Sequence, residues 1–206
     1  MPVTLADLVG GGQAAVLTME IQRGVVGDLS SFPDLAAAAR EVGVVANTAR
    51  LLAAARAAGV PVVHCTAGFR PDRRGSPPNA PLMSAMLRRP GHLEDGSPAV
   101  ELVPDLGPAP GDLFSHRSHG VSPFTGTTLD PTLRALGVAT VVATGVSVNL
   151  GIVGLAIEAV NLGYRVVVAT DAVCGVPRDY ADAVTRHTLA LVALLATSDE
   201  VAVALS

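Results

Sequence analysis

The sequence of 206 residues contains no tryptophan, and aromatic side chains make up only 3% of it. It also contains no lysine, so all fourteen of its basic residues are arginines. Because large rings are scarce, the core must be built from alanine, valine and leucine, whose small side chains let helices pack closely on strands. Half of the residues are hydrophobic, and a chain of this length can bury a sizeable core. We therefore predict a single domain over residues 1–206.

Other absences exclude whole classes of protein. The two cysteines, Cys65 and Cys174, cannot build a disulfide scaffold, and they form no C-x-x-C metal pair. The net charge of −4, without a block of like charge, argues against nucleic acid as a partner, and we interpret the arginines at 70–89 as part of a solvated or substrate-facing loop. No apolar run is long enough to span a membrane, and residues 1–13 lack the features of a signal peptide. We expect a cytoplasmic protein that binds neither nucleic acid nor membranes.

Apolar runs alternate with alanine-rich helical stretches along most of the chain. The predicted strands are residues 14–19, 60–65, 112–116, 138–144, 165–170 and 200–205. The predicted helices are residues 35–58, 129–136, 149–162 and 180–196. Residues 66–111 are rich in proline, glycine and arginine, which predicts a long functional loop or lid with one short helix near 82–89.

Continuous apolar strands separated by helices indicate a parallel sheet that is covered on both faces. The predicted fold class is therefore α/β, a three-layer α/β/α sandwich with Rossmann-like layering, a six-stranded parallel sheet and a central first strand. Ligands of such sheets bind beyond the carboxyl ends of the strands. We therefore expect the chemistry to lie in the segments that follow the strands.

The first strand runs directly into Glu20. A carboxylate at the mouth of an apolar strand is partly desolvated, which suits it to proton transfer. The same position also suits a glutamate that accepts hydrogen bonds from neighbouring loop amides, and the two interpretations are equally consistent with the sequence.

Two histidines and an arginine follow the third strand, at His116, Arg117 and His119. The H-x-x-H spacing of the histidines invites comparison with a zinc site, but zinc needs at least three protein ligands and no cysteine or carboxylate accompanies this pair. We expect no metal, and we interpret Arg117 as a binder of an anionic substrate and a histidine as a carrier of protons.

The fourth strand passes into a helix through residues 145–151, and a helix N-terminus offers free amides to an anion. The spacing is not G-x-G-x-x-G, which argues against a dinucleotide cofactor. Ser147 lacks the G-x-S-x-G context of a serine nucleophile. Cys65 ends a strand, but a lone cysteine is more often a small core residue, and Cys174 is interpreted in the same way.

Taken together, these segments resemble the isochorismatase-like, or cysteine hydrolase, superfamily over residues 13–205. Residues 19–22 (MEIQ) are similar to its hhDxQ pattern with glutamate for aspartate. Residues 122–129 resemble its K-x-x-x-S-x-F-x-G-T-x-L signature, and residues 144–151 its TGV-x-x-N-x-C element, followed by a similar tail through Glu158 and residues 163–166. The resemblance implies a hydrolase of the isochorismatase-like fold that forms dimers or tetramers.

The departures from the family pattern concern its catalytic residues, which are most often an aspartate, a lysine and a nucleophilic cysteine. Glu20 takes the aspartate place, Ser118 falls at the lysine place, and Gly151 stands where the cysteine would be. Arg117 or His119 is the alternative occupant of the lysine space. Family members that hydrolyse a vinyl ether resemble this chain in carrying glycine at that place, and their reaction needs an acid rather than a nucleophile.

The sequence thus predicts a cofactor-free and metal-free hydrolase that acts on a small, anionic metabolite by acid–base catalysis. Glu20 is the expected acid, Arg117 the carboxylate binder, His119 the residue that orients water, and Gly151 the vacant nucleophile position. The expected substrate-binding residues are Gln22, Phe69, Arg70, Ser118, Phe124, Val146 and Ser147. Two alternatives stay open: a catalytically silent module that binds a small molecule or a protein, and a hydrolase that depends on Cys65.

Overall fold

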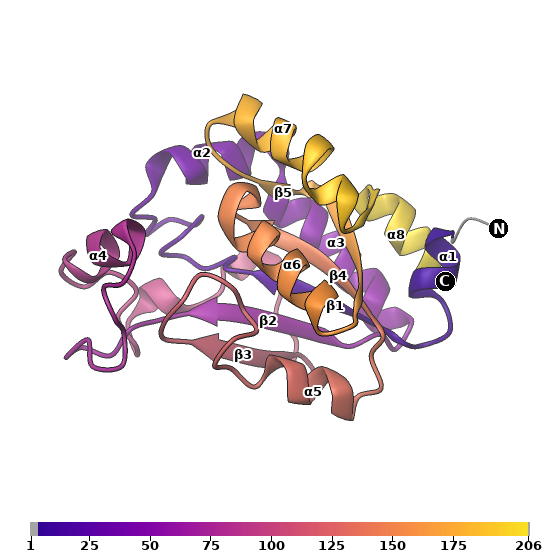
Figure 1. Cartoon of the computed structure of the whole chain (residues 1–206), viewed down its shortest axis with the longest axis horizontal. Helices are drawn as coiled ribbons and strands as arrows, with labels where there is room; N and C mark the ends of the chain where they lie inside the picture. Colours follow the sequence, from indigo (N-terminus) through magenta and orange to yellow (C-terminus); the bar gives the residue numbers. More distant parts are fainter. Residues whose placement is uncertain (1–3, 206) are drawn as a thin grey trace.

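The computed structural model describes residues 4–205, which form a parallel sheet with helices on both faces (Figure 1). The strand order is β3-β2-β1-β4-β5-β6, and every neighbouring pair is parallel. The strands are β1 Ala14–Met19, β2 Val62–Ala67, β3 Leu113–Arg117, β4 Thr140–Val146, β5 Arg165–Cys174 and β6 Leu194–Ala196. The predicted six-stranded parallel sheet with β1 in a central place is therefore confirmed.

Two apolar layers hold the helices against the sheet, because successive side chains of a strand point to opposite faces. One layer joins the sheet to α1 Leu5–Val9, α2 Pro33–Val42, α3 Val44–Ala57 and α8 Ser198–Leu205. The other joins it to α5 Leu129–Ala135, α6 Val153–Asn161 and α7 Arg178–His187. Val16 of β1 belongs to the first layer, and Leu17 belongs to the second. Burial of one such side chain contributes about 1.5–3 kcal/mol, so β1, buried along its whole length, fixes both layers at once.

The helix predicted over residues 35–58 is wrong in one respect, because two helices share this stretch. Gly43 separates α2 from α3 and has a φ of 79°, in the left-handed region that glycine enters without steric cost. The sequence is rich in alanine on both sides of Gly43, so its composition does not predict the break between the two helices. The second strand also starts two residues later than predicted, at Val62.

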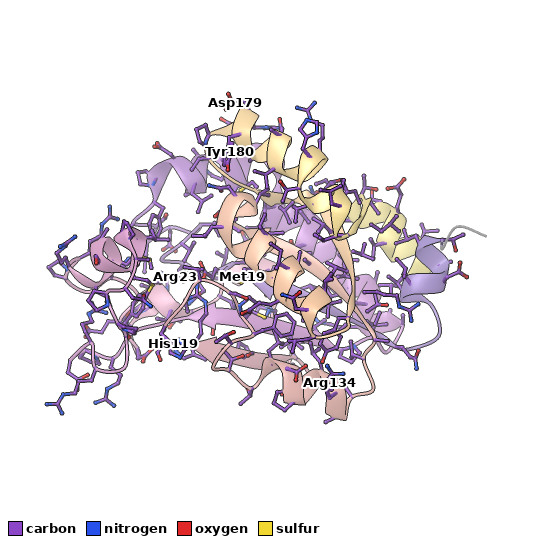
Figure 2. All side chains as sticks on the ribbon, in the orientation of Figure 1. Met19, Arg23, His119, Arg134, Asp179 and Tyr180 are labelled. Atoms are coloured by element: carbon purple, nitrogen blue, oxygen red, sulfur yellow. The ribbon has the colours of Figure 1, made fainter. Side chains whose placement is uncertain are left out.

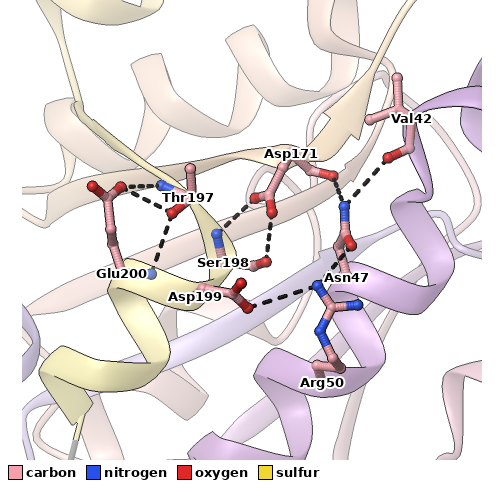
Figure 3. Close-up of polar contacts among 8 residues, drawn as sticks. All are labelled: Val42, Asn47, Arg50, Asp171, Thr197, Ser198, Asp199 and Glu200. Carbon is pink, nitrogen blue, oxygen red and sulfur yellow. Dashed lines mark hydrogen bonds and ion pairs between the residues drawn. The ribbon is translucent and has the colours of Figure 1, made fainter.

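The C-terminal prediction is wrong as well, because residues 200–205 belong to helix α8 and the sixth strand lies at Leu194–Ala196. Glu200 accepts a hydrogen bond from the backbone N–H of Thr197 (2.7 Å), and the Thr197 hydroxyl accepts one from the N–H of Glu200 (3.2 Å). This reciprocal pair is a capping box, which starts a helix. Asp171 supports the same turn by accepting hydrogen bonds from the backbone and the hydroxyl of Ser198 (Figure 3).

The remaining elements follow the sequence more closely. The loop between β2 and β3 contains the expected short helix, α4 Pro81–Leu87, and two 3₁₀ turns, η1 Pro98–Val100 and η2 Pro104–Leu106. The helix predicted at 149–162 begins as a π-helical turn, η3 Val148–Ile152, before α6. The helix predicted over residues 180–196 is wrong at its C-terminal end, because α7 ends at His187 and is followed by a turn, η4 Leu189–Leu191, and by β6. Within residues 4–205, no helix combines the length and the apolar character that a membrane crossing requires.

A buried polar network fixes the edge strand β3 to the centre of the sheet. His64 of β2 is fully buried, and its Nδ1 lies 2.8 Å from the hydroxyl of Thr18 in β1. Its Nε2 lies 3.0 Å from Asp112, just before β3, and Arg56 of α3 donates to both oxygens of the same carboxylate. Burial acts to raise the pKa of Asp112, but the hydrogen bonds from Arg56, the Ala109 amide and His64 outweigh it and lower the pKa to about 2.

The network predicts a pH-dependent contribution to stability. Because the folded pKa of Asp112 lies below its unfolded value of about 3.9, the contribution is complete above about pH 4 and is lost as the pH falls towards 2. We expect Asp112→Asn to lower the free energy of unfolding by about 2–3 kcal/mol at pH 7, and by much less at pH 2. Urea unfolding from pH 2 to 7 measures this, with the exposed Asp105→Asn as the control. An equal loss at every pH would contradict the assignment.

Candidate functional site

A cavity of about 420 Å³ opens at the carboxyl ends of the central strands. Its walls come from the segments after β1, β2 and β3, from the turn between β4 and α6, and from α4 and residues 31–35. Most of the lining is aliphatic or aromatic, with Phe32, Phe69 and Met86 among the large side chains. An apolar cavity with a few convergent polar groups is the usual form of a small-molecule site.

Glu20 and Arg117 form a buried ion pair in the wall of this cavity. Arg117 ends β3 with a side chain that is 7% exposed, and its Nη2 donates to Glu20 Oε1; the Glu20 side chain is 17% exposed. The other terminal nitrogen, Nη1, donates to the carbonyl of Gly120 (2.6 Å). Burial lowers the pKa of Arg117 to about 10, which still leaves the guanidinium charged at neutral pH. Arg117 thus brings a positive charge into direct contact with the Glu20 carboxyl group in the wall of the cavity.

The backbone at Glu20 is strained in order to present this carboxylate. Its φ is 51°, in the left-handed region that non-glycine residues seldom adopt, and its N–H donates to the carbonyl of Cys65 (2.9 Å). Such a conformation costs about 1–3 kcal/mol and is concentrated at functional sites. The strain supports a functional interpretation of Glu20 over that of a glutamate that only caps loop amides.

Gly151 and Ser147 line the cavity from the turn between β4 and α6. A Cβ atom placed on Gly151 would lie 2.9 Å from the carbonyl oxygen of Val146 and 3.2 Å from Cε of Met19. The first distance is shorter than a real Cβ contact, so a side chain at position 151 would require the cavity wall to shift.

The segment that resembles the family's middle signature anchors the loop after β3. Glu158 of α6 accepts hydrogen bonds from the hydroxyls of Ser122 and Thr125. Phe124 is buried in the second apolar layer and stacks on Tyr164 with ring centroids 5.9 Å apart. Phe124 therefore supports the loop and does not line the cavity, contrary to the role we expected for it.

Two of the predicted substrate-binding residues, Gln22 and Val146, support the fold instead. Gln22 is fully buried; its amide group donates to the carbonyls of Ala67 (2.8 Å) and Val100 (2.9 Å) and accepts from the N–H of Ala67. Val146 is also fully buried and belongs to the first apolar layer. Neither residue lines the cavity, whereas Phe69 does.

The predicted residues of the surrounding loops also lie outside the cavity lining. Arg70 is exposed and pairs with Asp72 at 2.8 Å. The Ser118 carbonyl accepts a hydrogen bond from Ser76 (2.6 Å). His119 lies two residues beyond the end of β3 (Figure 2). Its ring lies against Gly126. Of the three candidates for the lysine space, Arg117 is thus the residue that contacts Glu20.

The structure brings further residues to the cavity that the sequence did not single out. Ser31, Arg89 and Asn149 contribute polar groups to its lining. Arg89 belongs to the arginines interpreted as solvated or substrate-facing, and Asn149 is the asparagine of the TGV-x-x-N-x-C element, but the sequence predicts no individual role for either residue. Ser31 lies in a loop without any motif, so no signal in the sequence identifies it.

Cys65 has the properties of a core residue. It is 2% exposed, belongs to the second apolar layer, and does not line the cavity. Burial raises the pKa of its thiol to about 12, so the reactive thiolate is not formed near neutral pH. Among residues 4–205 there is no cluster of three or more histidine, cysteine, aspartate or glutamate side chains that could hold a metal ion.

The comparisons with known proteins agree with this architecture. The family model described as the isochorismatase domain matches residues 14–200. Ureidoacrylate amidohydrolase RutB of Methylobacterium radiotolerans is 37% identical over 140 residues, which cover 63% of this chain and only 54% of that protein. The protein of the same name from Rhizobium rhizogenes is 31% identical over 202 residues, or 90% of this chain and 78% of that protein.

A solved structure extends the agreement to three dimensions. An isochorismatase family protein from Burkholderia thailandensis superposes with a TM-score of 0.77 at 29% identity, covering 95% of this chain and 96% of that one. The match of the family model, the similarity to RutB proteins and the shared fold all confirm the resemblance seen in the sequence. The chain belongs to the isochorismatase family.

Proposed function

We propose that this chain is a hydrolase that acts on a small anionic metabolite by acid–base catalysis, without a cysteine nucleophile and without a cofactor. The observation that carries the proposal is the buried Glu20–Arg117 pair in the wall of an apolar cavity. The relatives support hydrolysis as the reaction, since both are named amidohydrolases, and the substrate in their name is a small carboxylate.

Arg117 supplies the binding step. Its guanidinium presents a planar array of donors that suits a carboxylate, and its charge persists at neutral pH. A substrate carboxylate that enters the cavity competes with Glu20 for these donors. As the pair loosens, Glu20 loses its stabilising cation in an apolar surrounding, and its protonated form becomes more favourable.

Glu20 then supplies the chemical step. In its protonated form it donates the proton to the reacting atom of the substrate, and as a carboxylate it takes a proton from the water that completes hydrolysis. No thiol takes part, because Gly151 stands at the nucleophile position and Cys65 lies outside the cavity. We leave His119 out of this mechanism because it does not line the cavity.

A catalytically silent binding module is the second candidate function. It is favoured by the direct contact between Glu20 and Arg117, which neutralises both groups in the empty site. The two candidates differ in one result. A silent module is stabilised by a small carboxylate but does not turn it over.

Substitution of Glu20 tests the catalytic proposal. Glu20→Gln keeps the size of the side chain but removes the transferable proton, so turnover should fall by at least about a hundredfold, while substrate binding should not weaken, because a neutral amide competes less strongly for Arg117. Arg117→Gln should instead weaken binding. Steady-state kinetics with ureidoacrylate and with isochorismate measure both effects, and Cys65→Ser is the control that should stay within a few-fold of the wild type. An inactive Cys65→Ser together with an active Glu20→Gln would overturn the mechanism.

The packing around Gly151 gives a second test. Because an added Cβ lies 2.9 Å from the Val146 carbonyl, Gly151→Ala should lower the free energy of unfolding by about 1–3 kcal/mol. Gly111→Ala is the matched control, since a Cβ there meets nothing within 4 Å. Urea unfolding of both variants makes the comparison. Equal stabilities of the two variants would show that the cavity wall can move to accept a side chain at position 151. Packing would then not be the reason for the glycine.

We also propose that the chain is a homo-oligomer, a dimer or a tetramer. Leu150, Ile157 and Val160 expose apolar side chains along η3 and α6, and burial of such a surface between copies is favourable. Light scattering at micromolar concentration should give at least twice the mass of one chain. Replacement of Ile157 and Val160 by serine should lower that mass, and a monomeric wild-type protein would contradict the proposal.

A further inference from the structure

The cavity contains a second polar position, at Ser31, which is formed by a different part of the chain from the Glu20–Arg117 pair. Ser31 lines the main cavity and also a smaller hollow of about 210 Å³, and Arg89 and Leu93 are shared by both. The Ser31 hydroxyl lies 2.8 Å from Nδ1 of His92. His92 itself is 6% exposed, and its Nε2 is buried without a hydrogen-bond partner among the described residues.

These contacts fix the direction of the hydrogen bond between the two side chains. The ring of His92 is neutral near pH 7, because burial and then the charges of Arg89 and Arg73 lower its pKa to about 4. A neutral imidazole carries one N–H. If that hydrogen were on Nε2, it would be a buried donor without a partner, which is the less common and more costly arrangement. The hydrogen therefore lies on Nδ1, and His92 donates to the Ser31 oxygen.

The Ser31 hydroxyl hydrogen is consequently left without a good acceptor among residues 4–205. Its one recorded acceptor is the carbonyl of Gly24, at 3.5 Å, which is the limit of a hydrogen bond. Arg89 lies beside Ser31, because its Nη1 donates to the Ser31 carbonyl (2.5 Å) and its guanidinium lies over the ring of Phe32. Arg89 forms no ion pair within residues 4–205. A hydroxyl hydrogen without a close acceptor, beside an arginine that has no ion-pair partner among these residues, is suited to an oxygen acceptor.

We propose that Ser31, oriented by His92, is a specificity-determining hydrogen-bond donor for an oxygen atom of the substrate other than the carboxylate held by Arg117. The inference rests on the proposed function, since it assigns a second contact in the same cavity. The substrate class is accordingly a small carboxylate with a carbonyl or a second carboxylate group elsewhere in the molecule. His92 is a positioning residue, because it acts on the substrate through Ser31.

The direct test compares two ligands of similar length, 3-ureidopropionate and hexanoate, which share a carboxylate but differ in the carbonyl. Isothermal titration calorimetry on the whole protein should show tighter binding of the ureido acid by the wild type. Ser31→Ala should reduce this preference about fivefold, the effect of one hydrogen bond of ~1 kcal/mol, whereas Ser31→Thr should retain it. Arg117→Gln should weaken the binding of both acids to a similar degree.

Two variants of His92 test its role as a donor. The amide nitrogen of asparagine can occupy the place of Nδ1, whereas that of glutamine reaches the place of Nε2. His92→Asn should therefore preserve the preference for the ureido acid, and His92→Gln should lose it, although both changes remove the same ring. In the wild type, nitrogen-15 NMR of the ring should report a hydrogen on Nδ1.

The outcomes separate this inference from the proposed function. If both acids bind through Arg117 but Ser31→Ala leaves the preference unchanged, the inference is wrong while the proposed function stands. If the preference depends on Ser31 but no carboxylate is ever hydrolysed, the inference stands and the catalytic proposal fails. A wild type that binds neither acid, a hydrogen on Nε2, or a covalent adduct on Ser31 detected by mass spectrometry would each overturn the inference.

Discussion

The site of this protein depends on one ion pair, between Glu20 and Arg117, that is largely removed from water. A buried charge without a partner costs several kcal/mol, so each of these residues requires the other. The pair also joins two strands that are not adjacent, because Glu20 follows β1, Arg117 ends β3, and β2 lies between them. The position of β3 relative to β1 therefore decides whether the site exists.

Much of the polar structure around the sheet serves that position. His64 and Asp112 tie the start of β3 to β2 and β1, while Gln22 ties the segment after β1 to the end of β2. Glu158 holds the loop that follows Arg117 by binding two of its hydroxyl groups. These contacts are buried or half-buried hydrogen bonds, which impose direction where the apolar layers impose only proximity. They explain why several residues that looked like substrate contacts are instead supports.

The glycine at position 151 is consistent with the packing of the same site. With glycine at position 151, the Val146 carbonyl and Met19 occupy space that a side chain would need. The cavity nevertheless persists, and its polar groups are two carboxylates (Glu20 and Asp34), two arginines, two serines and an asparagine. Such groups can bind oxygen atoms and move protons, which is what the proposed acid–base mechanism requires.

The sequence by itself determined the layers of this fold, its parallel sheet and the family. Apolar strands and alanine-rich helices can be recognised from the sequence pattern of each segment, and motifs such as residues 144–151 cover short continuous stretches of chain. It also placed Glu20, Arg117, Phe69, Ser147 and Gly151 correctly at strand ends, since a parallel sheet gathers those ends at one edge. The sequence also contains the capping box of Thr197 and Glu200, but the apolar run that follows it predicts a strand where the structure has a helix.

Only the tertiary structure decided which loop residues face the cavity. Arg117, Ser118 and His119 are neighbours in sequence, but only Arg117, the last residue of β3, contacts Glu20, while Glu158 anchors the loop that follows. Ser31, Arg89 and His92 come from two loops whose sequences carry no periodicity, and they meet because both loops pack over the same strand ends. A local sequence pattern predicts whether one segment is buried. A functional site depends instead on distances between segments, and those distances are set only when the sheet has assembled.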